Sequence, residues 1–171
     1  SNIYSSGESS YSQFALATNG SKLVVGYTWS NSYASIKVGT MSGATVTFGS
    51  RQQISTTMKK VYGLAYNAAS DTFLVAGGAT TSDTTPKFLP FTVNQSTGTA
   101  TFGTESTVSG LSGINWNVIS GVNNYFRVVG RDYNSGYGKL FSVYNITVSS
   151  SVPSFSVSSV SADADQHETP M

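Results

Sequence analysis

An aromatic step recurs three times along this chain, and its spacing constrains the fold more than any other feature. Phe48 and Phe102 each stand in a Thr-Phe-Gly step and Phe155 stands in a Ser-Phe-Ser step, 54 and 53 residues apart. A repeat of this length indicates structural units that cannot bury their own apolar faces and must stack on their neighbours. The sequence therefore predicts a modular β array.

Each repeat has the pattern of four short strands separated by turns. Asn19-Gly20 favours a tight hairpin, Ser42-Gly43 and Thr97-Gly98 supply residues that accept positive φ, and Asn123-Asn124 tolerates it. Apolar residues nowhere keep the spacing of three and four that a helix needs, so helices are not expected. The predicted segments are a lead-in over 1–13, repeats over 14–56, 57–110 and 111–162, and a polar tail or the start of a further repeat over 163–171.

Four strands in about fifty residues match one blade of a β-propeller. The predicted fold is all-β, with three tandem four-stranded antiparallel sheets in a propeller-like arrangement. Closed propellers typically have about four to eight blades. Because the chain begins at Ser1 without a methionine and 163–171 reads like the beginning of another repeat, we expect either part of a longer chain or a ring completed by identical chains. A β-sandwich built from the same strands is the alternative.

Composition narrows the classes of function. The chain has no cysteine, and only 10% of its residues are charged, well below the usual quarter or so. A surface of hydroxyl and amide groups favours an extracellular or virion-surface location. A net charge of +1 without a basic stripe argues against nucleic-acid binding. No segment approaches the roughly 18 consecutive apolar residues of a membrane span.

Catalytic and metal-binding patterns are not found. A glycosidase needs two carboxylates facing each other about 5 to 10 Å apart, and only Asp132 lies in a plausible binding loop. The single histidine, His167, lies in the polar tail with Asp163, Asp165 and Glu168, and this group lacks the glycine and the spaced bidentate glutamate of hard-cation loops. We expect no catalytic residue, no metal and no cofactor.

The segment Gly130–Lys139 reads Gly-Arg-Asp-Tyr-Asn-Ser-Gly-Tyr-Gly-Lys after an apolar strand, and the first repeat ends in Thr-Val-Thr-Phe-Gly. This combination resembles the tandem β-repeats of tail-fibre and other surface proteins of marine bacteriophages, over about residues 14–160. The second repeat departs from the pattern, because its central loop lacks Arg-Asp and tyrosine and contains Pro86 and Pro90 instead. The resemblance implies a virion-surface or host-attachment role and supplies no catalytic set.

The central loops of the first and third repeats carry aromatic and planar polar side chains that suit a shallow carbohydrate site. Exposed rings would stack on sugar faces, and amides and carboxylates would bond the hydroxyl groups. Alternatively, the same rings pack between repeats, because alternation buries half of the side chains of a strand. The candidate ligand-binding residues are Tyr27, Trp29, Asn31, Tyr33, Arg131, Asp132, Tyr133, Asn134 and Tyr137.

Two functional hypotheses of different class follow. The first, which we expect, is a non-enzymatic virion or cell-surface adhesion module that contacts host glycans. The second is a purely structural repeat that builds a fibre, ring or decoration layer with other virion proteins or with identical chains. A fragment of a carbohydrate-active enzyme is a distant third hypothesis.

Overall fold

Antiparallel strands and their connections make up the part of the chain that the computed structural model describes, and no helix occurs within it. The all-β class predicted from the sequence is therefore confirmed. The described residues are 14–29, 33–79, 86–107, 114–120, 126–131, 138–143, 146–149 and 152–155.

The first repeat forms sheet 1, in which the strands β1 (Phe14–Thr18), β2 (Lys22–Trp29) and β3 (Tyr33–Ser42) pair in chain order. The position of a fourth strand is shared by two short strands, β4 (Thr45–Phe48) and β5 (Gln52–Gln53). The first pairs with the C-terminal part of β3 and the second with its N-terminal part. The fourth strand of this repeat is thus interrupted.

The second repeat forms sheet 2 with the same topology. Its strands are β6 (Lys60–Asn67), β7 (Thr72–Gly78), β8 (Lys87–Val93), β9 (Ala100–Phe102) and β10 (Ser106–Thr107). Strands β6, β7 and β8 pair in chain order, while β9 and β10 pair with opposite ends of β8. The interruption of the fourth strand is therefore a shared property of the first two repeats.

The Phe-Gly step occupies the same backbone position in both sheets. The phenylalanine pairs with a residue of the third strand, and the following glycine donates its N–H to the carbonyl oxygen of the residue before that partner. The contacts are Phe48 with Gly39 and Gly49 N–H with the Val38 oxygen at 2.9 Å, and Phe102 with Phe91 and Gly103 N–H with the Pro90 oxygen at 2.8 Å. The step that defines the repeat in the sequence thus ends the first part of the interrupted strand.

The third repeat differs from the other two. Strands β11 (Ile114–Ser120), β12 (Phe126–Arg131) and β13 (Gly138–Val143) form sheet 3, while β14 (Ile146–Ser149) and β15 (Val152–Phe155) form a separate hairpin. Strand β15 lies against β8 and β9 of sheet 2. The three equal four-stranded sheets predicted from the sequence are therefore not what the described residues form, and none of the described sheets closes on itself.

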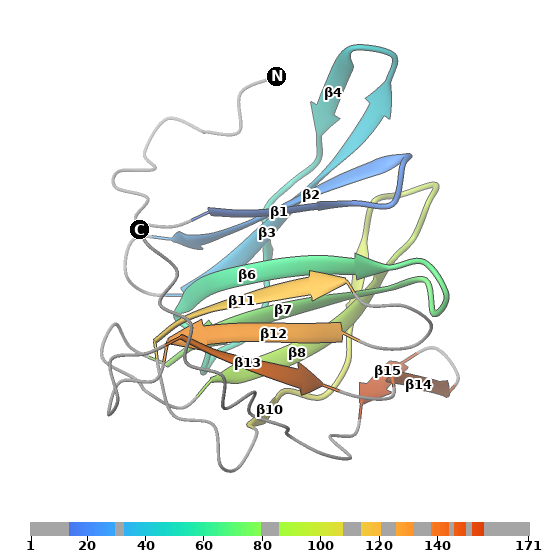
Figure 1. Ribbon diagram of the computed structural model, residues 1–171. Coiled ribbons are helices and arrows are strands. Elements are labelled where there is room, and N and C mark those ends of the chain that lie inside the picture. The colour runs from blue at the N-terminus through green and yellow to red at the C-terminus, as the bar shows by residue number, and fades with distance from the viewer. Residues whose placement is uncertain are drawn as a thin grey trace.

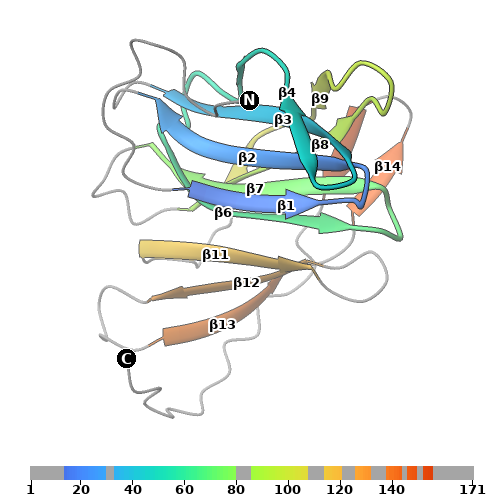
Figure 2. The same cartoon turned by 90° about the horizontal axis from the view of Figure 1, so that it is seen from above.

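The three sheets lie as successive layers in chain order (Figures 1 and 2). Strand β6 contacts β1 of sheet 1 on one side and β11 of sheet 3 on the other. The first strands of the three repeats thus run side by side through the molecule, and sheet 2 is the middle layer.

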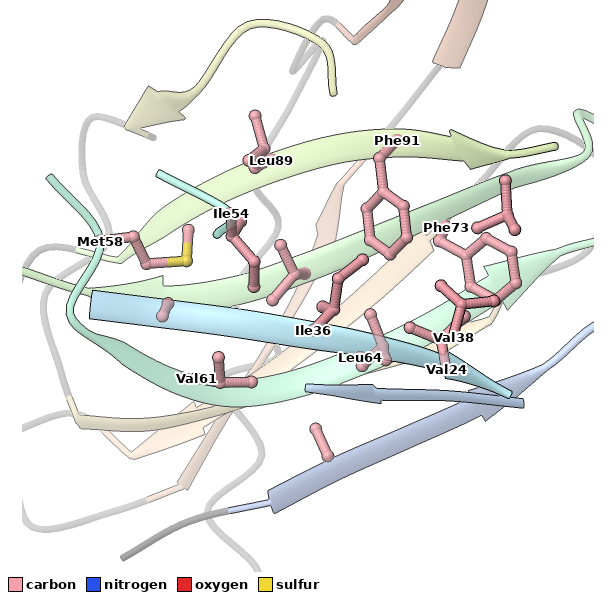
Figure 3. Close-up of a cluster of buried hydrophobic side chains, with 14 residues drawn as sticks. Val24, Ile36, Val38, Ile54, Met58, Val61, Leu64, Phe73, Leu89 and Phe91 are labelled. Carbon is pink, nitrogen blue, oxygen red and sulfur yellow. The ribbon is translucent and has the colours of Figure 1, made fainter. Parts of the chain in front are cut away.

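Sheets 1 and 2 share an apolar core. Val24, Ile36 and Val38 of sheet 1 face Phe73 and Phe91 of sheet 2 (Figure 3), whose rings stack with centroids 5.2 Å apart. Further buried members of this cluster are Ala15, Ala34, Ile54, Met58, Val61, Leu64, Val75, Leu89 and Val93. Burial of these side chains is the main force that holds the two layers together.

Every residue of β7 is buried. Because side chains alternate along a strand, Phe73 and Val75 face sheet 1 while Leu74 and Ala76 face the opposite side, where β11 of sheet 3 lies against β7. An uninterrupted buried strand is typical of a sheet that is covered on both faces. The second repeat therefore forms two interfaces at once.

Candidate interaction face

Sheet 1 has one face that points away from sheet 2, and we call it the outer face. Val24, Ile36 and Val38 point into the shared core, so alternation places Val25 and Lys37 on the other side. The strand register joins Leu16, Val25 and Lys37 in one row across β1, β2 and β3.

Four large hydrophobic residues are exposed among the side chains whose burial is described, which are Phe126 and those up to residue 107, and all four lie on this outer face. Leu16 is 60% exposed, Phe14 46%, Tyr33 40% and Met41 36%. Their places follow from the register, because each lies an even number of residues from Leu16 on β1 or from Lys37 on β3. Single exposed apolar residues are ordinary, but their concentration on one face indicates an interaction surface.

The outer face of sheet 1 has a covered counterpart in sheet 2. The rows Leu16–Val25–Lys37 and Leu64–Val75–Leu89 are joined by the same pairing. The last residue of each row, Lys37 or Leu89, lies two residues before the residue that pairs with the phenylalanine of the Phe-Gly step. Leu16 and Leu64 therefore occupy equivalent positions in the two repeats. Leu64 is only 5% exposed, since it belongs to the core that sheet 1 covers. Leu16 is therefore the exposed counterpart of a covered position.

The outer face is only partly open. Val25, Tyr27, Ser35 and Lys37 on β2 and β3 are buried. The exposed apolar surface is therefore a strip along β1, at Phe14 and Leu16, with Tyr33 and Met41 at the two ends of β3. The Thr18 hydroxyl lies 3.6 Å from the Met41 sulfur, which places Met41 beside the end of β1.

The predicted carbohydrate-binding residues are not gathered into one site by the described residues. Tyr27 is 1% exposed, and this burial corrects the expectation of an exposed stacking platform at that position. Tyr33 has the expected exposure. Trp29, which pairs with Tyr33, and Arg131, which pairs with Gly138, are described in their backbone alone.

The remaining predicted ligand contacts lie outside the described residues. They are Asn31, Asp132, Tyr133, Asn134 and Tyr137. The strands that flank the two central loops belong to sheets 1 and 3, which sheet 2 separates (Figure 2).

The Glu105 carboxylate joins the connection between β5 and β6 to sheet 2. Glu105 accepts hydrogen bonds from the hydroxyls of Ser55 and Thr57, and its Oε1 lies 2.9 Å from the Lys87 ammonium. Partial burial alone would raise the pKa of Glu105, but the Ser55 and Thr57 hydroxyls and Lys87 outweigh it and hold the pKa below its ordinary value. A single ionised carboxylate with these partners fixes a loop.

Two amide side chains add polar contacts across the covered interface. Gln52 donates from Nε2 to the Gly98 oxygen at 3.0 Å and accepts the Ala100 N–H at 2.8 Å. At the hairpin tips, the Ser21 hydroxyl lies 2.7 Å from the Gln95 Oε1 atom. Backbone groups at the start of β9 are thus bonded by a side chain of sheet 1.

Within the described ranges, no group of three histidine, cysteine or acidic side chains is placed to hold a metal ion, and the tail residues Asp163, Asp165, His167 and Glu168 lie outside those ranges. The same ranges contain no helix with the length and hydropathy that crossing a bilayer requires.

Comparison with protein-family models and with curated protein sequences finds no match.

The outer face was not predicted from the sequence. Its first strand reads Phe14-Ala-Leu-Ala, which is apolar at every position, so alternation gives no sign of which side is covered. The available signal was the equivalence of Leu16 with Leu64 through the repeat.

Proposed function

We propose that this chain is a non-enzymatic structural module that uses the exposed apolar strip along β1 to contact another protein surface, within a surface assembly such as a fibre, ring or layer. One observation carries the proposal. The exposed large hydrophobic residues of the described chain share a single face, and the equivalent face of sheet 2 is covered by a sheet.

The size of the exposed strip sets the strength of the contact. Complete burial of a leucine or phenylalanine side chain contributes about 1.5–3 kcal/mol, and Phe14 and Leu16 are already partly buried. Association costs at least about 4 kcal/mol of translational and rotational freedom. The strip alone therefore supports a weak contact, and a stable one requires the partner to follow the whole length of β1.

The proposal is tested with the apolar dye bis-ANS on dilute, folded protein. The native chain should bind the dye, and Leu16→Lys should clearly reduce the fluorescence because it places a charge in the middle of the strip. Thr47→Lys is the matched control, since Thr47 is exposed on β4 and its pairing with Thr40 places it on the opposite side of sheet 1. Dye binding no greater than that of a fully covered globular protein would overturn the proposal.

Adhesion to host glycans is a second candidate function, supported by the exposed ring of Tyr33 beside the first central loop. An exposed tyrosine offers both a stacking surface and a hydroxyl to a sugar. Glycan-array binding that is lost in Tyr33→Ala and retained in Leu16→Lys would support this role on a virion or cell surface. An array without bound glycans would count against it.

A further inference from the structure

We propose that β4 is a docking edge, at which the β4 strand of a second copy of this chain adds to sheet 1 in antiparallel register. The contact is made by the backbone edge of sheet 1 and does not use the apolar strip along β1, so it goes beyond the proposed function. Three features support it: the open edge of β4, the covered edge of its counterpart in sheet 2, and the sequence of the strand.

Strand β4 has an open edge in the part of the chain that the structure describes, because it pairs there with β3 and with no other strand. Hydrogen-bonded and non-hydrogen-bonded pairs alternate along antiparallel strands. The Met41 N–H donates to the Ser21 oxygen at 3.0 Å, on the β2 side of β3, so the pair of Met41 with Val46 is a non-hydrogen-bonded one. The N–H and C=O groups of Val46 and of Phe48 therefore point to the open edge.

The equivalent edge in sheet 2 is bonded by the preceding repeat. Val46 and Ala100 each lie two residues before the phenylalanine of the Phe-Gly step, so they are equivalent. The Ala100 N–H donates to Oε1 of Gln52, a residue of the first repeat, at 2.8 Å. Among the described residues, none outside sheet 1 accepts the Val46 N–H in the same way. The same backbone edge is therefore bonded from outside its sheet in the second repeat and open in the first.

The sequence around β4 lacks the features that prevent pairing between edge strands. Proteins protect such edges with charged side chains and proline, and neither occurs within 38–50. The strand itself reads Thr-Val-Thr-Phe, and all of these residues favour β structure. The hairpin that carries β4 projects beyond the layers (Figure 1), so sheets 2 and 3 do not block the approach of a further strand.

The edge is complementary to itself, which identifies a second copy as the partner. Antiparallel pairing with Thr47 opposite Thr47 of the second copy places Val46 opposite Phe48 on both sides. The edge-directed N–H and C=O groups of these residues then bond one another, and threonine pairs across strands are favourable. The contact is isologous and closes as a two-fold dimer.

The first experiment measures sedimentation velocity over a range of protein concentrations. Strand β4 has only 4 residues, so the native chain should be monomeric when dilute and dimeric when concentrated. Thr47→Lys and Thr47→Glu should each lose the dimer, because like charges then face each other. Thr101→Lys is the matched control and should keep it, since Thr101 is the equivalent exposed residue of β9.

Circular dichroism verifies that each variant is folded. Val46→Pro replaces any Thr47 variant that fails to fold, because proline there removes an N–H that points to the edge and no hydrogen bond to β3. It should also lose the dimer. A native chain that stays monomeric at every concentration, or a dimer that the edge variants leave unchanged, overturns the proposal.

The second experiment tests the pairing of β4 with itself. Affinity-tagged Thr47→Lys should capture untagged Thr47→Glu, because opposite charges then face each other across the joined edge. It should not capture untagged Thr47→Lys. Loss of the dimer in both single variants without capture in the mixture overturns the symmetric pairing.

Leu16→Lys separates this inference from the proposed function. It should reduce bis-ANS binding and keep the dimer, whereas Thr47→Lys should keep the dye binding and lose the dimer. A dimer that is lost in Leu16→Lys and kept in Thr47→Lys would mean self-association through the β1 strip and would overturn docking at β4. Absence of dye binding to the native chain would remove the proposed function alone.

Discussion

Sheets 1 and 2 are built on the same plan, with three strands in order and an interrupted fourth, yet they differ in burial. The sheet 2 face that packs on sheet 1 is covered, so that Leu64 of β6 is only 5% exposed, whereas its counterpart Leu16 of β1 is 60% exposed. The strand order is the same in both, and the rows through Leu16 and Leu64 are paired in the same way. The difference teaches that the burial of a position on the first strand of a sheet is set by the neighbouring layer and not by the repeat itself.

The two sheets also fill the same positions differently. In sheet 2, the rings of Phe73, Phe91 and Phe102 lie in a row, with centroids 5.2 and 5.5 Å apart. In sheet 1 the position of Phe91 is taken by Gly39, and a Cβ atom there would lie 2.9 Å from the Phe48 ring. The side chains of Val46 and Phe48 therefore occupy space that the third-strand side chain fills in sheet 2.

The largest expected effect tests the covered side of this comparison. Phe73→Ala removes a fully buried ring from the core between the sheets and should lower the free energy of unfolding by about 3–5 kcal/mol. Urea denaturation measures it. A loss as small as that of a substitution at an exposed site would show that the two sheets do not share a tightly packed core.

The equivalent leucines offer the sharpest comparison. Leu64→Ala should cost about 2–5 kcal/mol because it leaves a cavity, whereas Leu16→Ala should change the free energy of unfolding by less than about 0.5 kcal/mol in the monomer. Equal losses of free energy of unfolding for the two variants would mean that Leu16 on the outer face of sheet 1 is as well covered as Leu64 on sheet 2.

A smaller effect is expected for the amide that joins the two sheets. Gln52→Ala removes two hydrogen bonds to the backbone around Gly98 and Ala100 and should cost about 1 kcal/mol. The neighbouring Gln53→Ala is the control, because the exposed Gln53 bonds within its own segment, to the Ser55 oxygen. Hydrogen exchange of the Ala100 amide should accelerate in the first variant and not in the second.

The smallest effect is a dependence on pH. The folded-state pKa of Glu105 is held below its ordinary value of 4.5, so its ionised form stabilises the fold above that pH, and the contribution is lost as the pH falls through the lowered pKa. The native chain should therefore exceed Glu105→Gln in stability at neutral pH and approach it as the pH falls through the lowered pKa. A difference that stays constant between the two conditions would contradict this account.

The sequence was sufficient to predict the hairpins of the first two repeats. Gly20, Gly43 and Gly98 have positive φ in the turns where they were expected, because glycine accepts that conformation without strain. The interruption of the fourth strand was not predictable, since the segments after the two Phe-Gly steps carry no strand-breaking residue such as proline. The separation of β14 and β15 from sheet 3 likewise depends on contacts with β8 and β9.

The candidate site shows the limit of strand alternation. Tyr27 and Tyr33 belong to the same face of sheet 1, yet one is buried and the other is 40% exposed. Alternation assigns a residue to a face, but the extent to which that face is covered depends on tertiary packing. Exposed and buried tyrosines therefore could not be separated from the sequence.

The hairpin of β3 and β4 projects beyond the layers (Figure 1), and residues 41–45 at its tip are exposed around Gly43. Exposed tips of this kind are where chains best tolerate additional residues. A peptide epitope or a second small domain could be grafted between Ser42 and Thr45 without altering the buried layers. The tip of this hairpin is thus a suitable insertion site for displaying a foreign peptide on the protein.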